Sequence, residues 1–142
     1  MDKSKFKNTP YVKRVEKPWG YELHWVPENK PYMGKVLHIK EGTRISLQVH
    51  DQKQESWFLM NGKAKIIWEN ENGEMVETEM EVGFGYTCHL GQKHRLAGIT
   101  ECEIIEVSTP ETGNTYRLED DYSRPTETEE MRKDPNRGWK AD

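Results

Sequence analysis

The sequence predicts a single all-β domain that folds as a sandwich or a closed barrel. Short runs of β-branched and aromatic residues recur at similar spacing along the 142 residues. Glycines, prolines and asparagines separate these runs, and no helical periodicity lies between them. The length is that of one domain, and a hydrophobic fraction of 33% indicates a thin core or solvated ends.

Each expected strand is a run of apolar and β-branched residues that is bounded by turn formers. The strands cover residues 21–26, 34–40, 44–50, 56–60, 64–68, 74–80, 83–90, 94–96 and 101–109. Pro27, Pro31 and Gly34 separate the first two of them. Asn72-Gly73 favours positive φ and therefore a tight hairpin between 64–68 and 74–80.

Both ends of the chain are polar. Residues 1–12 are expected to form a Lys-rich arm and residues 125–142 a polar tail, both within the one domain, 1–142. Only the tail carries a helical pattern. Thr126 is the predicted N-cap of a short C-terminal helix over 126–133, and Glu129 would complete a capping box.

Charge and composition exclude several classes of protein. Twenty-one basic and twenty-five acidic residues are scattered along the chain, so no general attraction for nucleic acid or for anionic membranes is expected. No apolar run approaches the roughly 18 residues of a membrane span, and the start lacks a secretory signal. Cys88 and Cys102 are too few for a disulfide framework and are expected to be buried. We therefore expect a reduced, cytoplasmic protein.

Four polar side chains indicate a metal site. Gln48 and His50 are two residues apart in a strand and so share a face. A hairpin through the polar link 51–54 would return Glu55 to His50, and His94 opens a later strand at the same level. Imidazole nitrogens with carboxylate or amide oxygens suit one divalent ion, zinc first, with iron, manganese, cobalt and nickel as alternatives.

The spacing of these residues resembles the two motifs of the cupin superfamily. Five residues separate Gly42 from Gln48, four separate His50 from Glu55, and six more lead to Gly62. The second motif joins Gly83, His89, Gly91 and His94 in the same manner, although His89 stands where proline is usual. The resemblance spans residues 17–124. It implies a small double-stranded β-helix of jelly-roll type with Gln48, His50, Glu55 and His94 as metal ligands.

A narrower resemblance is to the mannose-6-phosphate isomerase type II family, which is also the C-terminal cupin of bifunctional enzymes that make GDP-mannose. The matching stretches are "KPWGYE", "ISLQVH", "ESWFLMNGKAKI", "HRL" and "YRLEDDYSR". The family usually has a run rich in His and Arg where this chain has "DQK" (51–53), and a histidine at Ser56. The resemblance implies an enzyme of carbohydrate metabolism that interconverts an aldose phosphate and a ketose phosphate, mannose 6-phosphate being first choice.

Isomerisation of this kind removes a proton next to a carbonyl and returns it to the neighbouring carbon. A divalent ion would act as Lewis acid and template. A metal-bound hydroxide, Glu55, His89 and Lys53 all remain candidates for the general base. The resemblance at 116–124 suggests Arg117 for the phosphate, since a planar cation suits it. Arg44 and Trp57 are further substrate-binding candidates, and Lys53 is expected on an exposed loop.

Two other functions stay open. His50, Glu55 and His94 alone form a two-histidine, one-carboxylate set that could hold Fe(II) in a dioxygenase, which oxygen uptake would reveal. The altered "DQK" segment favours a non-catalytic module that binds a sugar phosphate or sugar nucleotide without turnover. A homodimer formed through sheet faces or exchanged arms is compatible with the polar arm.

Overall fold

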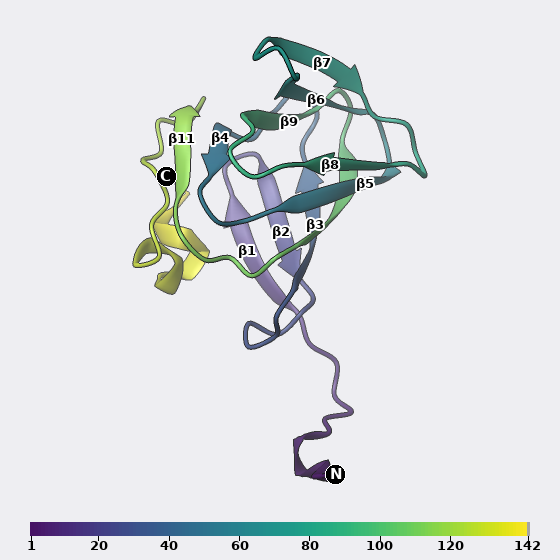
Figure 1. Cartoon of the computed structure of the whole chain (residues 1–142), viewed down its shortest axis with the longest axis vertical. Helices are drawn as coiled ribbons and strands as arrows, with labels where there is room; N and C mark the ends of the chain where they lie inside the picture. The colour runs from purple at the N-terminus through teal and green to yellow at the C-terminus, as the bar shows by residue number, and fades with distance from the viewer. Residues whose placement is uncertain (142) are drawn as a thin grey trace.

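The computed structural model describes residues 1–141 as two antiparallel sheets that face one another (Figure 1). In spatial order the first sheet contains β1 (Lys13–Lys17), β2 (Gly20–His24), β3 (Met33–Ile39), β10 (Cys102–Ser108), β5 (Glu55–Asn61) and β8 (Gly85–Cys88). The second contains β11 (Thr115–Glu119), β4 (Leu47–His50), β9 (His94–Gly98), β6 (Ala64–Glu69) and β7 (Met75–Glu79). Three short 3-10 helices complete the chain: η1 (Lys3–Lys5), η2 (Met131–Lys133) and η3 (Pro135–Gly138).

The all-β prediction is confirmed, and each expected strand is present with modest shifts at its ends. Two strands were not predicted. β1 is rich in charge, and it pairs with β2 through a tight turn at Pro18 and Trp19. β11 pairs with β4 so that Thr115 lies opposite His50. Neither strand has the apolar run on which a prediction from sequence depends.

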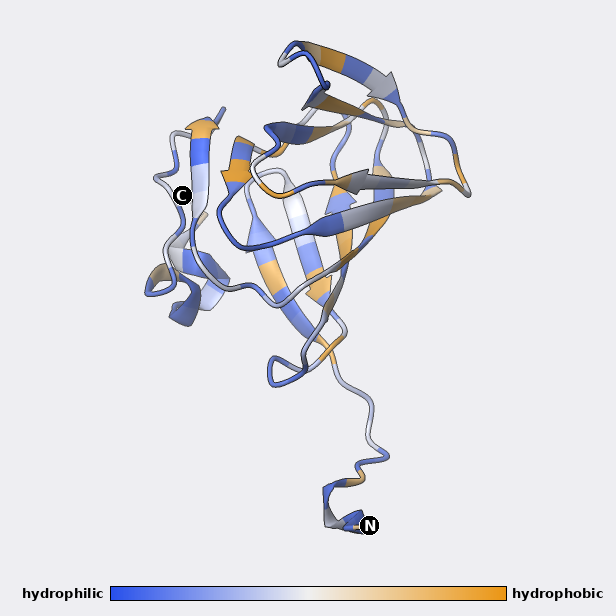
Figure 2. Ribbon diagram, viewed as in Figure 1, coloured by the Kyte–Doolittle hydropathy of each residue, from blue (hydrophilic) through white to orange (hydrophobic). Residues whose placement is uncertain are grey.

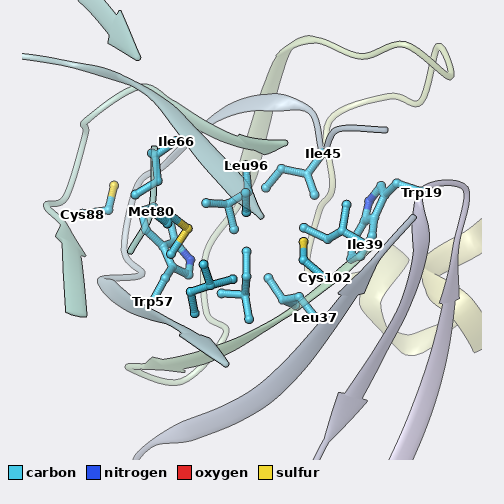
Figure 3. Close-up of a cluster of buried hydrophobic side chains, with 13 residues drawn as sticks. Trp19, Leu37, Ile39, Ile45, Trp57, Ile66, Met80, Cys88, Leu96 and Cys102 are labelled. Carbon is cyan, nitrogen blue, oxygen red and sulfur yellow. The ribbon is translucent and has the colours of Figure 1, made fainter. Parts of the chain in front are cut away.

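The hydrophobic core fills the space between the sheets (Figure 3). Trp57, Leu59, Ile66, Leu96 and Ile104 are almost completely buried there. Both cysteines are free and buried, as expected. Hydrophobic and hydrophilic residues alternate along many strands, because successive side chains point to opposite faces of a sheet (Figure 2).

The predicted helix over 126–133 is wrong. Glu127 forms an isolated bridge with Thr115, which places its backbone in an extended conformation. Thr126 therefore cannot cap a helix, and only the single turn η2 follows. Glu129, the expected partner in a capping box, instead accepts a hydrogen bond from the Gly113 amide at 2.7 Å. Tertiary pairing has overridden a local capping signal.

The two polar ends behave differently. Residues 1–12 are exposed, and Figure 1 shows them leaving the barrel. The tail packs against the barrel, and Glu127 and Arg137 are buried in it. No helix within residues 1–141 has both the length and the apolar character needed to span a membrane.

Gly62, in the turn between β5 and β6, should not tolerate a side chain. Its φ is 78°, and a Cβ atom would lie 2.3 Å from the Glu101 carbonyl oxygen. We expect Gly62→Ala to lower the free energy of unfolding by about 3 kcal/mol or more, because a backbone clash adds to the left-handed strain. Gly42→Ala is the matched control, since its φ is 72° with no atom within 4 Å, and should cost about 1–2 kcal/mol. Urea denaturation measures both, and equal losses would contradict the clash.

Candidate metal centre

Three buried side chains converge where β4, β5 and β9 meet. His50 ends β4, Glu55 begins β5 and His94 begins β9. Glu55 Oε1 lies 2.8 Å from His94 Nε2 and 3.3 Å from His50 Nε2. One ligand atom from each residue falls within 4.8 Å of the others. The hairpin through residues 51–54 thus returns Glu55 to His50, as the sequence predicts.

The two imidazoles are oriented as metal ligands are. His94 Nδ1 lies 2.9 Å from the Gln92 carbonyl oxygen, and His50 Nδ1 lies 3.0 Å from Thr115 Oγ1. Both Nε2 atoms are buried and face the Glu55 carboxylate, so the three residues point toward one position. Metal-bound histidines commonly use the second nitrogen in this way to fix the ring. The three residues therefore fit a divalent ion.

The charge states follow from the surroundings. Burial favours neutral His50 and lowers its pKa. Burial opposes charge on His94 too, but the Cys88 thiol and the Glu55 carboxylate outweigh it and raise the pKa of His94 to about 10. Burial also opposes ionisation of Glu55, yet Lys53 and both histidines hold its pKa well below the usual range. Without an ion, the site carries a proton on His94 where the metal would bind.

Gln48, the fourth predicted ligand, borders the same cavity as His50. It pairs with His94 across the β4–β9 ladder, and its side chain is half-buried. Its Oε1 accepts a hydrogen bond from Ser46 Oγ at 3.0 Å. One lone pair of that oxygen remains for an ion, so ligation by Gln48 stays a prediction.

The barrel encloses a cavity of about 50 Å³ at this site, and charged side chains build much of its wall. The six cations are Lys17, Lys35, Lys53, Arg117, Arg124 and Arg137, and the four carboxylates are Glu22, Glu106, Glu111 and Glu127. The lining therefore has two more cations than carboxylates, although Lys53 and Arg124 also pair with Glu55 and Asp120 behind it. Such a surface complements an anion.

Lys53 lies inside this wall, so its predicted exposure is wrong. Its Nζ is 2.9 Å from Glu106 Oε2, 3.0 Å from Glu55 Oε2 and 3.3 Å from Glu111 Oε1. Burial opposes its charge, but the three carboxylates raise its pKa well above the usual range. Nothing in the polar stretch "DQKQ" distinguishes this lysine from a surface residue.

Glu106 is a site residue that the sequence did not single out. Burial and the nearby Glu55 carboxylate raise its pKa to about 7. Trp57 Nε1 donates to its Oε1 at 3.3 Å, so Trp57 supports the wall from the core. Trp57 itself is only 1% exposed and does not border the cavity. The alternation of β10 puts Glu106 on the same face as Ile104. This alternation is the one sequence feature that could have identified Glu106 as a site residue.

Of the remaining predicted site residues, one borders the cavity and two lie outside it. Arg117 borders the cavity, where it donates to Glu127 Oε2 at 3.1 Å and to the Pro125 carbonyl at 2.7 Å. Arg44 is outside, in a two-point ion pair with Asp121 at 2.7 and 2.8 Å. His89 is exposed on the outer surface beside Trp68. The structure therefore brings Arg117 and Lys53 to the candidate ligands, but not Arg44 or His89. Trp57 packs against His94, with ring centroids 5.2 Å apart, but does not border the cavity.

The chain matches the family described as "Mannose-6-phosphate isomerase C-terminal" over residues 4–127. The chain belongs to this family. It is 30% identical over 118 residues to the alginate biosynthesis protein AlgA of Pseudomonas aeruginosa, covering 80% of this chain and 23% of AlgA. It is 31% identical over 119 residues to the xanthan biosynthesis protein XanB of Xanthomonas campestris, covering 82% and 23%. The chain thus spans about a quarter of the length of these relatives.

Solved structures confirm the cupin fold. An oxalate decarboxylase of Lactobacillus farciminis, solved as a formate complex, superposes with a TM-score of 0.67 at 18% identity, covering 81% of this chain and 37% of the other. A Bacillus subtilis oxalate decarboxylase gives the same TM-score at 17% identity, covering 81% and 33%. At such identities the likeness concerns the fold alone.

We expect His50→Ala, Glu55→Ala and His94→Ala each to abolish stoichiometric metal binding. Each change removes one ligand from a small set, whereas loss of an outer partner costs only about 10–100-fold in affinity. Elemental analysis after dialysis measures the bound ion.

Thr115→Val is the matched control, because it removes the partner of His50 Nδ1 and a longer contact with Arg132 at 3.3 Å but no candidate ligand. It should weaken binding without abolishing it, and Gln48→Ala should also be mild. Retention of a full equivalent of metal by any two of the three alanine variants would refute the site.

Metal binding should release about one proton per ion near pH 7, because the ion replaces the proton on His94. The pKa of about 10 means that this proton competes with the metal throughout the neutral range, so the apparent affinity should fall as the pH falls. Calorimetric titration with Zn²⁺ in two buffers of different ionisation enthalpy measures the release. Heats that do not depend on the buffer would contradict a protonated His94.

Proposed function

We propose that this chain, as a member of the mannose-6-phosphate isomerase C-terminal family, is a metal-dependent isomerase of a sugar phosphate. The interconverted pair is an aldose phosphate and its ketose phosphate, mannose 6-phosphate being the first choice. The observation that carries the proposal is the buried His50, Glu55 and His94 triad beside a cavity whose lining has more cations than carboxylates. The triad suits an ion, and the wall suits a phosphate.

The residues fit zinc or another divalent ion held by His50, Glu55 and His94, with Gln48 as the proposed fourth ligand. When bound, such an ion supplies Lewis acidity toward the oxygens of a carbonyl and its neighbouring hydroxyl. A single carboxylate among neutral ligands leaves the ion net positive. That residual charge is what isomerisation next to a carbonyl requires.

The side chains around the ion divide the remaining tasks. Lys53 keeps its proton because three carboxylates surround it, so it would position charge and donate hydrogen bonds rather than act as a base. Glu106 Oε2 lies 2.9 Å from Lys53 Nζ, and Glu106 borders the cavity. Glu106 is therefore a carboxylate that could accept a proton, in addition to the predicted Glu55. His89 would have to act from outside the cavity.

Arg117 is the proposed partner of the phosphate. Its guanidinium is 6% exposed, borders the cavity and has a buried Nε without a hydrogen-bond partner in the described chain. A buried donor without a partner costs free energy unless a ligand satisfies it. Holding the phosphate away from the ion would position the reacting carbons and contribute to the rate itself.

The "DQK" segment (51–53), which departs from the family pattern, favours a second candidate, a module that binds a sugar phosphate without turnover. The test is an anaerobic assay of the metal-loaded chain with mannose 6-phosphate and a series of other sugar phosphates. Binding of a sugar phosphate with no interconversion of any of them would favour the module.

Arg117→Ala should lower kcat/KM for the phosphorylated sugar by about 2–3 kcal/mol, the size of a lost charge-assisted hydrogen bond. The rate with the unphosphorylated sugar and the bound metal should barely change. Arg44→Ala is the matched control, since Arg44 pairs with Asp121 outside the cavity and should leave both rates unchanged. Equal losses on the two sugars would give Arg117 a structural role instead.

A further inference from the structure

The segment from Thr128 to Ala141, which we call the C-terminal segment, lies beyond the part of the chain that matches the family. Its 3-10 helices η2 and η3 lie beside β1 and β11 (Figure 1). Asn136 Oδ1 accepts from the Glu16 amide of β1 at 2.7 Å, and Arg132 donates to the Gly113 carbonyl at 2.7 Å. Polar contacts, more than apolar burial, hold the segment in place.

Arg137 points from this segment into the barrel. Its Nη1 donates to Glu127 Oε1 at 2.8 Å and its Nη2 to Glu111 Oε2 at 2.5 Å, and the residue is 8% exposed. Asn136 and Arg137 both adopt left-handed backbone conformations, with φ of 51° and 56°. Consecutive non-glycine residues rarely do so unless surrounding contacts hold them. The two ion pairs are such contacts.

Arg137 also lines two cavities. On its inner side lies the cavity of about 50 Å³ that contains His50. On its outer side lies a pocket of about 750 Å³, which we call the vestibule. Arg117 and Arg124 border both spaces as well. Arg137 is the one of these three that comes from the C-terminal segment, so its displacement would widen the passage between the two spaces.

The charge of the vestibule indicates what it binds. Its lining includes four cations, Arg117, Arg124, Arg137 and Lys140, and no carboxylate among the described residues. The three arginines also pair with carboxylates outside this lining, which are Glu127, Asp120 and Glu111. Tyr122 and Trp139 add aromatic surface. Arg117 contributes the buried Nε that has no partner within residues 1–141. These donors suit a phosphate group.

We propose that the C-terminal segment is a lid over the metal cavity, and that a phosphate group bound in the vestibule draws Arg137 away from Glu111 and Glu127 and so opens it. The ligand class is a phosphate dianion, free or as a sugar monoester. This inference rests on the metal site of the proposed function but does not require isomerisation.

Arg137 can leave Glu111 and Glu127 for a phosphate because neither carboxylate would then be without a cationic partner. Glu127 keeps Arg117 at 3.1 Å and Lys17 at 3.9 Å, both from outside the C-terminal segment. Glu111 keeps Lys53 at 3.3 Å and its close contact with Lys35. A buried carboxylate without a partner would oppose opening strongly, and these contacts remove that obstacle. Arg137 in turn would exchange two carboxylates for the phosphate oxygens.

The experiment measures how fast the neutral chelator 1,10-phenanthroline removes Zn²⁺ from the full chain. Inorganic phosphate should accelerate removal about tenfold relative to KCl of equal ionic strength, because it shifts the population towards the open lid. A sugar phosphate should act likewise, and acceleration by the sugar phosphate alone would still support the lid. Arg137→Gln should release zinc about tenfold faster without phosphate and show little further acceleration.

Lys133→Gln is the matched control. Lys133 is in the same segment, but its side chain is 73% exposed and borders neither space, so removal should match that of the wild type. If Arg137→Gln does not fold, Lys140→Gln tests the same idea from an exposed position. It should reduce the affinity for inorganic phosphate, measured by calorimetry, and weaken the acceleration.

Two results would overturn the lid. One is a rate of zinc removal that neither phosphate nor a sugar phosphate changes. The other is an Arg137→Gln variant that folds, binds zinc and releases it at the wild-type rate. Failure to isomerise any sugar leaves these rates unaffected, so the lid and the proposed function fail independently.

Discussion

The structure depends on keeping the Glu55 carboxylate ionised inside the barrel. A buried charge without partners destabilises the fold strongly. Glu55 has three partners within ion-pair distance: His50, His94 and Lys53. Lys53 must in turn be balanced, and it contacts Glu106 and Glu111. The buried Glu55 carboxylate is therefore connected to further charges in the loop before β5, on β10 and in the loop before β11. This network joins the candidate metal ligands to the charged wall of the cavity.

The same strands build the core and the charged wall. On β5, Glu55, Trp57 and Leu59 share the inward face, and on β10 Ile104 and Glu106 do so. Each inward row therefore has a polar end and an apolar end, and because the strands are antiparallel the polar ends lie together, so the ion site lies against the end of the core. The core supplies most of the apolar burial and holds the charged end in register. The Trp57–Glu106 hydrogen bond joins the two regions.

The meeting of the three candidate ligands could be predicted because it depends on local sequence. The framing glycines and the short hairpin fix where His50, Glu55 and His94 fall relative to one another, and the structure brings all three together. The wall could not be predicted, because alternation shows which residues share a face but not whether that face meets water or counter-charges. Lys35, Glu106 and Glu111 therefore read as solvent-facing residues. The 126–133 helix failed for the opposite reason, since a valid capping pattern lost to the burial of Glu127 against Arg132 and Arg137.

Stability alone does not explain so many buried charges. Replacing buried ion pairs with apolar side chains of similar volume is often neutral or stabilising, so such pairs are weak indicators of stability. The apolar end of this barrel shows that its strands can carry a hydrophobic interior. The buried charges instead indicate bound ligands. A metal ion would complete the triad, and an anion would pair with the surplus cations. A wall of mixed sign also permits exchange, because each carboxylate has several cations and can release one. Arg137 is the cation whose release would open the most space, since it alone enters the wall from a segment outside the family match.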